Sequence, residues 1–136
     1  MTTPKLFRVI LPVSDTERAA QFYSTVLGIK GQRVSPGRYY FDCDGTILAC
    51  FDPRADGDGF EPRPNQDHVY FAVDDLERRH AAAKTLECLS TDEVHGAPAG
   101  EIVRRPWGER SFYAVDPFGN KICFVDRATT FTGRPR

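Results

Sequence analysis

Two stretches, FRVILPVSDTERAAQFY at residues 7–23 and DHVYFAVDDLERRHAAA at residues 67–83, follow the same pattern and decide the fold. In each, a run of β-branched and apolar residues leads into a helix-start signal, which predicts a strand followed by a helix. Ser14 opens a capping box, and Asp74 repeats the spacing with aspartate as the cap. Gly28 can take the left-handed conformation that ends the first helix. The chain therefore contains an internal repeat.

Short runs with strand composition follow each helix, and turn residues separate them. Asp44-Gly45 marks a tight hairpin in the first copy, and residues 116–119 (DPFG) form the corresponding turn in the second. The expected strands are 31–34, 38–43 and 46–51 in the first copy, and 101–105, 109–115 and 120–126 in the second. The sequence thus predicts an α+β fold of two tandem βαβββ modules.

The spacing between the two copies supports the repeat and places an insertion. Asp15 and Asp75 are 60 positions apart, whereas Gly45 and Gly119 are 74 apart, so the second copy holds 14 extra residues. These fit into the polar stretch 90–100. We expect one domain over residues 1–136, with module one at about 5–52, a proline-rich linker at about 53–66, module two at about 67–127 and a tail at 128–136.

Composition narrows the class of protein. The chain has 27% charged and 40% apolar residues and a net charge of −1, which is typical of a globular protein and gives no electrostatic reason to expect nucleic acid or a membrane as a partner. No apolar run approaches the roughly 20 residues of a membrane helix, and the first residues lack the pattern of a secretory signal. We therefore expect a cytoplasmic protein. Of its four scattered cysteines, Cys43, Cys50 and Cys88 are interpreted as buried thiols, whereas Cys123 is the exception that is also a candidate site residue.

The sequence resembles the vicinal oxygen chelate superfamily, which comprises glyoxalases, bleomycin resistance proteins and dioxygenases. The resemblance rests on LPVSDTERAAQFYSTVLG at residues 11–28, HVYFAVDDLE at 68–77 and, most specifically, PWGERSFYAVDPFGNKICFVD at 106–126. It implies that the two modules form a curved half-barrel around a pocket, which a second subunit often completes. A homodimer is therefore expected, and the exposed strand edges of an incomplete barrel agree with that expectation.

The resemblance also implies where a metal would bind. Metal-dependent members place ligands at the start of each module's first strand and in its last strand, usually His, Gln or Glu, and the metal acts as a Lewis acid on vicinal oxygens of the substrate. Here these positions are Arg8 and Ala49 in module one, and His68 and Cys123 in module two. Only His68 is an ordinary ligand. A guanidinium has no lone pair to donate and repels a cation, so we expect no metal cofactor, although a divalent metal stays possible through His68 and Cys123.

The interpretation we favour is a metal-free pocket that binds a small, possibly anionic organic molecule. Arg8 would replace the metal charge with a planar fork of donors, and His68 would serve as hydrogen-bond partner or general base. The further candidates for ligand contact are Tyr39, Phe41, Tyr70, Trp107 and Phe112 as aromatic walls and Arg110 as a second anion contact. Each also has a structural interpretation, as a core aromatic, an exposed charge or a hairpin ion pair.

Other functions stay open at this point. A metal-dependent lyase, isomerase or dioxygenase would use His68, Cys123 and one further ligand. A metal-free enzyme would use Cys123 as a nucleophile and His68 as its base, which requires the two groups to come within about 3 Å. A sequestering protein would bind an antibiotic and release it unchanged. The candidate catalytic residues are therefore His68 and Cys123.

Overall fold

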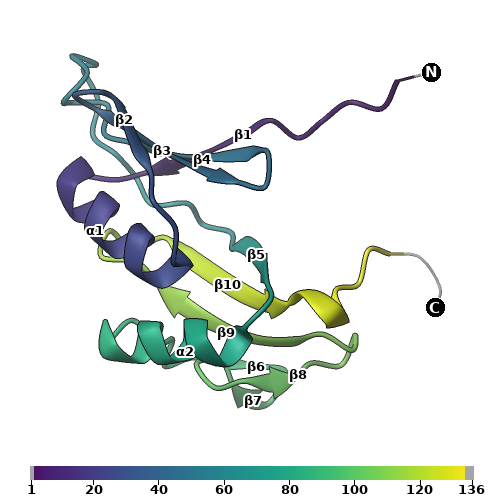
Figure 1. Cartoon of the computed structure of the whole chain (residues 1–136). Coiled ribbons are helices and arrows are strands. Elements are labelled where there is room, and N and C mark those ends of the chain that lie inside the picture. The colour runs from purple at the N-terminus through teal and green to yellow at the C-terminus, as the bar shows by residue number, and fades with distance from the viewer. Residues whose placement is uncertain (1, 134–136) are drawn as a thin grey trace. The chain divides into compact units, whose positions relative to one another are not determined.

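The structure is a computed structural model that describes residues 2–133, and it divides into two compact units between Asn65 and Gln66. Unit 1 contains β1 (Arg8–Pro12), α1 (Thr16–Leu27), β2 (Gln32–Ser35), β3 (Arg38–Cys43) and β4 (Thr46–Phe51). Its four strands lie in the order β1-β4-β3-β2, with β1 and β4 parallel and the remaining pairs antiparallel. Helix α1 lies against one face of this sheet (Figure 1).

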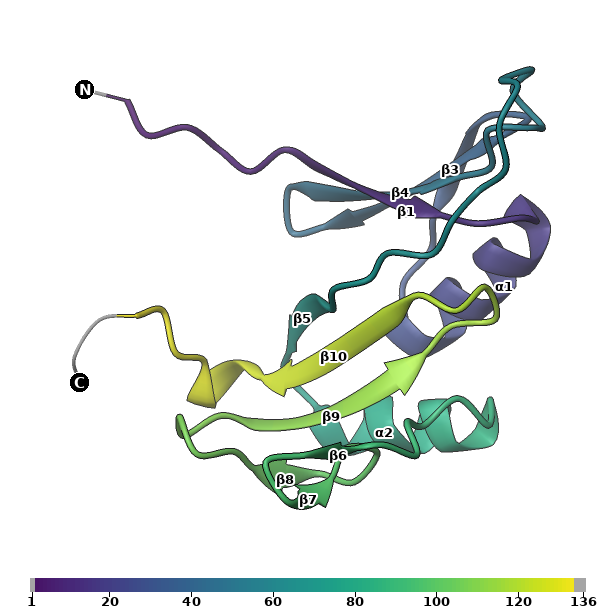
Figure 2. The same cartoon turned by 180° about the vertical axis from the view of Figure 1, so that it is seen from behind.

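Unit 2 repeats this topology. It contains β5 (Val69–Val73), α2 (Leu76–Thr85), β8 (Val103–Arg104), β9 (Arg110–Val115) and β10 (Lys121–Asp126), and its strands lie in the order β5-β10-β9-β8. Strands β5 and β10 are parallel, like β1 and β4. Helix α2 packs against β9 and β10 (Figure 2). The predicted pair of βαβββ modules is therefore confirmed.

The insertion in the second module is a small hairpin. The polar stretch 90–100 contains β6 (Glu93–Val94) and β7 (Ala97–Pro98), which pair with each other. Strand β8 is shorter than the predicted 101–105, and beyond it the Arg105 amide still donates across the hairpin to the Glu109 carbonyl at 2.7 Å. After β10 a short 3₁₀ helix (Arg127–Thr129) begins the tail.

Both helices begin one residue later than the capping signals predict. The N-caps are Asp15 and Asp75, not Ser14 and Asp74, and each carboxylate accepts a hydrogen bond from the amide three residues on, at 3.1 Å. Two adjacent residues can each cap the helix, Ser14 or Asp15 in one case and Asp74 or Asp75 in the other, so the sequence leaves the first helical residue uncertain by one position. Helix α1 ends as expected, with Gly28 left-handed at φ 70°.

The core of each unit lies between its sheet and its helix. In unit 1 the Tyr23 ring of α1 stands 6.2 Å from that of Phe41 on β3, and both side chains are fully buried. In unit 2 the Phe112 ring stacks on Phe124, which stacks on Phe71, at 5.0 and 5.4 Å between ring centroids. Between residues 2 and 133 neither helix has the length and apolar character needed to cross a membrane.

Candidate functional site

The face of the unit 1 sheet opposite α1, here called the helix-free face, carries Arg8, Ile10 and Pro12 from β1. This follows from alternation, because Leu11 between them is buried toward the helix. Ile10 pairs with Ala49 on β4, and Ala49 pairs with Tyr40 on β3, so these three side chains point to the same face. The β1 side chains that alternation places together, Arg8, Ile10 and Pro12, therefore lie on the face that α1 does not cover.

Arg8 is an exposed cation held by aromatic rings. Its guanidinium carbon lies 4.8 Å from the ring centroid of Phe7 and 5.5 Å from that of Tyr40. Tyr40 is also fixed from the other side, because Arg38 Nη1 donates to its hydroxyl at 3.2 Å. Within residues 2–133, no carboxylate forms an ion pair with Arg8. Its charge and donors are therefore available to an anion.

Two predicted pocket aromatics point to the opposite face, which corrects the prediction. Tyr39 and Phe41 share one face of β3, with ring centroids 5.4 Å apart, and Phe41 packs in the core under α1. Residues 39–41 are all aromatic, so the sequence alone does not set which of them faces the helix. Pairing with β4 decides it, and Tyr40 is the aromatic beside Arg8.

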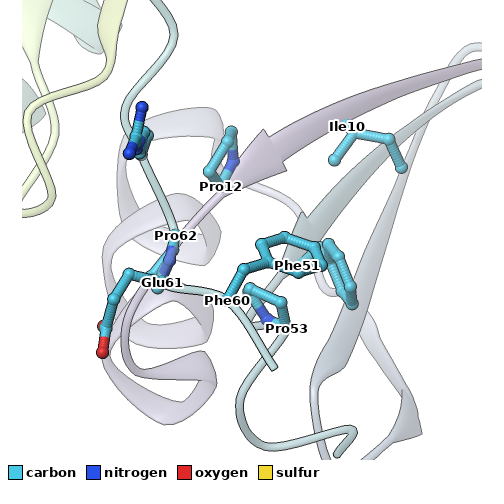
Figure 3. A pocket seen from close by; sticks show the side chains of 8 residues that line it. Ile10, Pro12, Phe51, Pro53, Phe60, Glu61 and Pro62 are labelled. Carbon is cyan, nitrogen blue, oxygen red and sulfur yellow. The ribbon is translucent and has the colours of Figure 1, made fainter. Parts of the chain in front are cut away.

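A hollow of about 540 Å³ lies on the helix-free face, at the end of the strands away from Arg8 (Figure 3). The sheet supplies one part of its lining and the linker after β4 supplies the other. Its lining is mostly apolar and consists of Ile10, Pro12, Phe51, Pro53, Phe60, Glu61, Pro62 and Arg63. Its volume falls in the range of small-molecule sites, about 300–1,000 Å³.

The linker that forms this wall is fixed at both ends. Asp56 accepts hydrogen bonds from Ser35 Oγ at 2.8 Å and from the Gly37 amide at 2.7 Å. Asn65 Nδ2 donates to the Ile10 carbonyl at 3.3 Å. The sequence pattern predicts only a spacer for this segment and does not predict a site role for Phe60. The available signal was that Phe60 is its one large apolar residue.

In unit 2, three predicted site residues, His68, Tyr70 and Cys123, lie on the side of the sheet opposite α2. His68 directly precedes β5, and Tyr70 pairs with Cys123, which pairs with Tyr113. The Tyr113 ring lies 4.9 Å from that of His68 and 6.5 Å from that of Tyr70. Burial, aided by the charge of Lys121, lowers the pKa of His68, so its imidazole is neutral at neutral pH. That His68 and Arg8 contribute to one pocket stays a prediction.

Cys123 has the surroundings of an inert core thiol, contrary to the nucleophile expected of a metal-free enzyme. It is fully buried in an apolar cluster with Ala99, Tyr113 and Val125. Burial raises its pKa to about 12, so the thiol keeps its proton at neutral pH. A protonated thiol is a weak nucleophile and a weak metal ligand.

The remaining candidates in unit 2 have structural partners. Phe112 is fully buried on the helix face of β9, with its ring 4.9 Å from that of His80 on α2. Arg110 lies on that same face, where it bonds to Glu77 at 3.1 Å and Asp126 at 2.8 Å. The sequence pattern placed both residues at the pocket, but pairing with β10 turns them toward the helix.

Trp107 lies in the turn before β9. Its indole nitrogen donates to Glu109 at 2.7 Å, and its ring packs at 5.3 Å against that of His95 in the β6–β7 hairpin. Glu109 also accepts a hydrogen bond from the amide of Phe131 in the tail, at 2.8 Å. The structure therefore gives Trp107 a role in fixing the hairpin and the tail.

Residues 5–124 match the sequence profile of the Glyoxalase/Bleomycin resistance protein/Dioxygenase superfamily. The chain belongs to this superfamily. Solved structures agree in fold. A lactoylglutathione lyase from Agrobacterium tumefaciens is 22% identical with a TM-score of 0.70, and the match covers 96% of this chain and all of that one.

Two further solved structures match this chain in fold. A glyoxalase/bleomycin resistance protein from Albidiferax ferrireducens T118 is 24% identical with a TM-score of 0.70, over 89% of this chain and 98% of that one. The oxidase ChaP-H2 is 22% identical with a TM-score of 0.71, over 93% and 95%. No curated protein sequence matches the chain significantly. At these identities the likeness concerns the fold alone.

The donor set at the superfamily's metal positions does not fit a divalent cation. Arg8 has no lone pair to donate, and Ala49 has only a methyl group. His68 and the protonated Cys123 are the remaining two, whereas a catalytic metal site needs about three protein ligands. Across residues 2–133, no group of three or more His, Cys, Asp or Glu side chains gathers in a way that holds a metal.

Proposed function

We propose that this protein binds a small organic anion on the helix-free face of unit 1, with Arg8 taking the role that a metal ion has in other superfamily members. The observation that carries the proposal is the state of Arg8. It is an exposed guanidinium, fixed by the rings of Phe7 and Tyr40, and no carboxylate within the described residues neutralises it.

The position of the guanidinium supports binding of an anion with an apolar body. Arg8 begins β1, but its guanidinium reaches over Tyr40, which is level with Ile10 across the sheet. Ile10 is also one of the residues that line the hollow. An anionic group on Arg8 therefore has apolar surface beside it. The two aromatic rings restrict the guanidinium before the ligand arrives, which lowers the entropy cost of binding.

The expected energy is that of a charge-assisted hydrogen bond. A carboxylate or sulfonate can accept two parallel N–H donors of a guanidinium. Bonds to charged groups contribute about 1.5–3 kcal/mol, which corresponds to roughly tenfold to hundredfold in affinity. A metal is not required for this interaction, so binding should persist in a chelator.

Fluorescence titration with 8-anilinonaphthalene-1-sulfonate, an organic anion with an apolar body, tests the proposal in buffer that contains EDTA. We expect the Arg8→Gln variant to bind the dye about tenfold or more weakly than the wild type. Arg18→Gln is the matched control, because Arg18 is an exposed arginine on α1. Equal binding by wild type and Arg8→Gln, or loss of wild-type binding in EDTA, contradicts the proposal.

A further inference from the structure

We infer that the organic anion is an aromatic carboxylate whose ring sits in the hollow between Phe51 and Phe60. This inference rests on the proposed function and adds to it the chemical class of the ligand and the residues that select it. It is carried by the lining of the hollow, by the way its walls are held, and by the distribution of charge at its rim.

The ring of Phe51, which lines the hollow, is held in place by the side chain of Arg38. The Arg38 guanidinium carbon lies 4.3 Å from the Phe51 ring centroid. Arg38 is itself fixed, because it donates to the Tyr40 hydroxyl at 3.2 Å and lies 3.7 Å from Asp56. One side of the Phe51 ring is thus covered by a cation, and the ring also lines the hollow.

The Phe60 wall is exposed, although the backbone around it is fixed. The side chain of Phe60 is 59% exposed, so it does not contribute to the core. Asp56 fixes the linker before it and Asn65 fixes the linker after it. The turn that receives Asp56 is tight, since a β-carbon on Gly37 would collide with the backbone and side chain of Asp56. A fixed aromatic ring without a core role is suited to contact a ligand.

The shape of the lining favours a planar ring over a flexible chain. Prolines at 12, 53 and 62 present rigid rings beside the two phenyl groups (Figure 3). Rigid walls have little freedom to close around an alkyl chain, and a flexible chain loses rotamer freedom when it binds. Offset or edge-to-face contact between aromatic rings adds about twofold to tenfold in affinity beyond burial of the same area.

Charge at the rim favours a carboxylate. Glu61 is engaged by Arg54 at 3.3 Å, and its carboxylate points away from Phe51 and Pro53 in Figure 3. Arg63 lines the hollow and forms no ion pair in the described part of the chain. Arg8 does not line the hollow, but it stands two residues before the lining residue Ile10 on the same face of β1. The hollow therefore has a mostly apolar lining that includes the cation Arg63, and Arg8 adds a second positive charge on the same face of the sheet.

Calorimetric titration of the full chain with three compounds tests the inference: 2-naphthoate, decanoate and 2-naphthamide. Decanoate keeps the charge and replaces the rings with a chain, whereas naphthamide keeps the rings and removes the charge. We expect 2-naphthoate to bind at least fivefold more tightly than decanoate and about tenfold more tightly than naphthamide. Phe60→Ala should weaken 2-naphthoate about fivefold to tenfold and decanoate about twofold.

Phe131→Ala is the matched control, because Phe131 is 45% exposed and does not line the hollow. If decanoate binds as tightly as 2-naphthoate, while Arg8→Gln weakens both, the aromatic inference is wrong and the proposed function stands. If neither carboxylate binds, the proposed function fails as well. If Phe60→Ala leaves the affinity for 2-naphthoate unchanged, the hollow is not the site of the ring.

Discussion

Arg105 is a buried cation that forms no ion pair with a carboxylate among residues 2–133. Its side chain is 2% exposed, and its guanidinium lies 5.1 Å from the Tyr113 ring centroid. It donates to Ser111 Oγ at 3.0 Å and to several backbone carbonyls, among them Ala99 at 3.3 Å and Glu101 at 3.2 Å. These bonds join the segment after β7 to β9. The side-chain hydrogen bonds of Arg105 therefore hold this segment to β9, where the two-residue strand β8 supplies few backbone hydrogen bonds.

Removal of this guanidinium should destabilise the protein strongly. We expect Arg105→Ala to lower the free energy of unfolding by about 2–4 kcal/mol, because buried carbonyls lose their donors. The side chain of the neighbouring Arg104 is exposed and donates to the Gly108 carbonyl at 2.6 Å, so Arg104→Ala should cost less than about 1 kcal/mol. Urea denaturation of both variants measures the difference. Equal costs would show that Arg105 does not support the segment.

Cys123 should resist alkylation in the folded protein. Its pKa of about 12 leaves very little thiolate at pH 8, and no surface of the residue is exposed. Mass spectrometry after iodoacetamide treatment should find Cys123 unmodified in native protein and modified in urea. Rapid labelling of Cys123 in the native state would restore the nucleophile hypothesis that the structure argues against.

The same thiol should make stability depend on alkaline pH. The folded protein binds this proton more tightly than the unfolded chain, in which the pKa is 9.0. Its stabilisation is therefore fully present below pH 9 and is lost as the pH rises towards 12, by up to about 4 kcal/mol. Cys123→Ala should flatten this part of the curve of unfolding free energy against pH. An unchanged slope would contradict the assignment.

Strands and turns differ in how far sequence predicts them. The sequence predicts a hairpin turn at Asp44-Gly45, and both residues have the positive φ that such a turn requires, at 55° and 94°. The predicted side-chain direction of β3, with Tyr39 and Phe41 at the pocket, is wrong, because Tyr39, Tyr40 and Phe41 suit either face. Only pairing with β4 places Tyr40 beside Arg8. The local signal fixes turns, whereas the facing of an all-aromatic strand depends on contacts distant in sequence.

For the linker, the sequence predicts the local conformation correctly but does not predict the contacts. Its prolines, glycines and charges correctly predict that it forms neither strand nor helix. They do not predict that it is anchored, because the anchors are a few hydrogen bonds to distant residues: Asp56 accepts from Ser35 and Gly37, and Asn65 donates to the Ile10 carbonyl. Composition indicates where regular structure is absent, but it does not indicate whether the segment packs against a sheet.

Asp56 should therefore control the order of the linker. We expect Asp56→Ala to lower the free energy of unfolding by about 1–3 kcal/mol, to speed trypsin cleavage within the linker and to weaken ligand binding. Asp58→Ala is the control, because Asp58 is exposed and its carboxylate forms no bond in the described structure. Limited proteolysis followed by mass spectrometry locates the cuts. If both variants are cleaved at the wild-type rate, Asp56 does not anchor the wall.

The repeat predicts the topology of both units because each module carries its own signals for strand, helix and turn. The metal positions that it locates predict chemistry less directly. Arg8 and Ala49 remove two donors, and the burial of Cys123, which the sequence does not reveal, removes a third. Membership of the superfamily is thus compatible with a site that uses a fixed guanidinium.

Purified protein should hold no stoichiometric divalent metal after dialysis. We expect fewer than about 0.1 metal ions per chain by mass spectrometry, and a melting temperature that EDTA leaves unchanged, because the donor set has too few ligands. Protein that retains zinc, iron, nickel or manganese at about one ion per chain, and that melts earlier in EDTA, would contradict this expectation.

The most direct test is an NMR titration of ¹⁵N-labelled full-length protein with 2-naphthoate in EDTA. The account predicts saturable shifts of the backbone amides of Arg8, Ile10, Phe51 and Phe60. It also predicts that the Arg8→Gln variant shows them only at about tenfold higher ligand concentration. Shifts confined to unit 2, or no shifts until a metal ion is added, would contradict the claim that unit 1 binds an organic anion through Arg8.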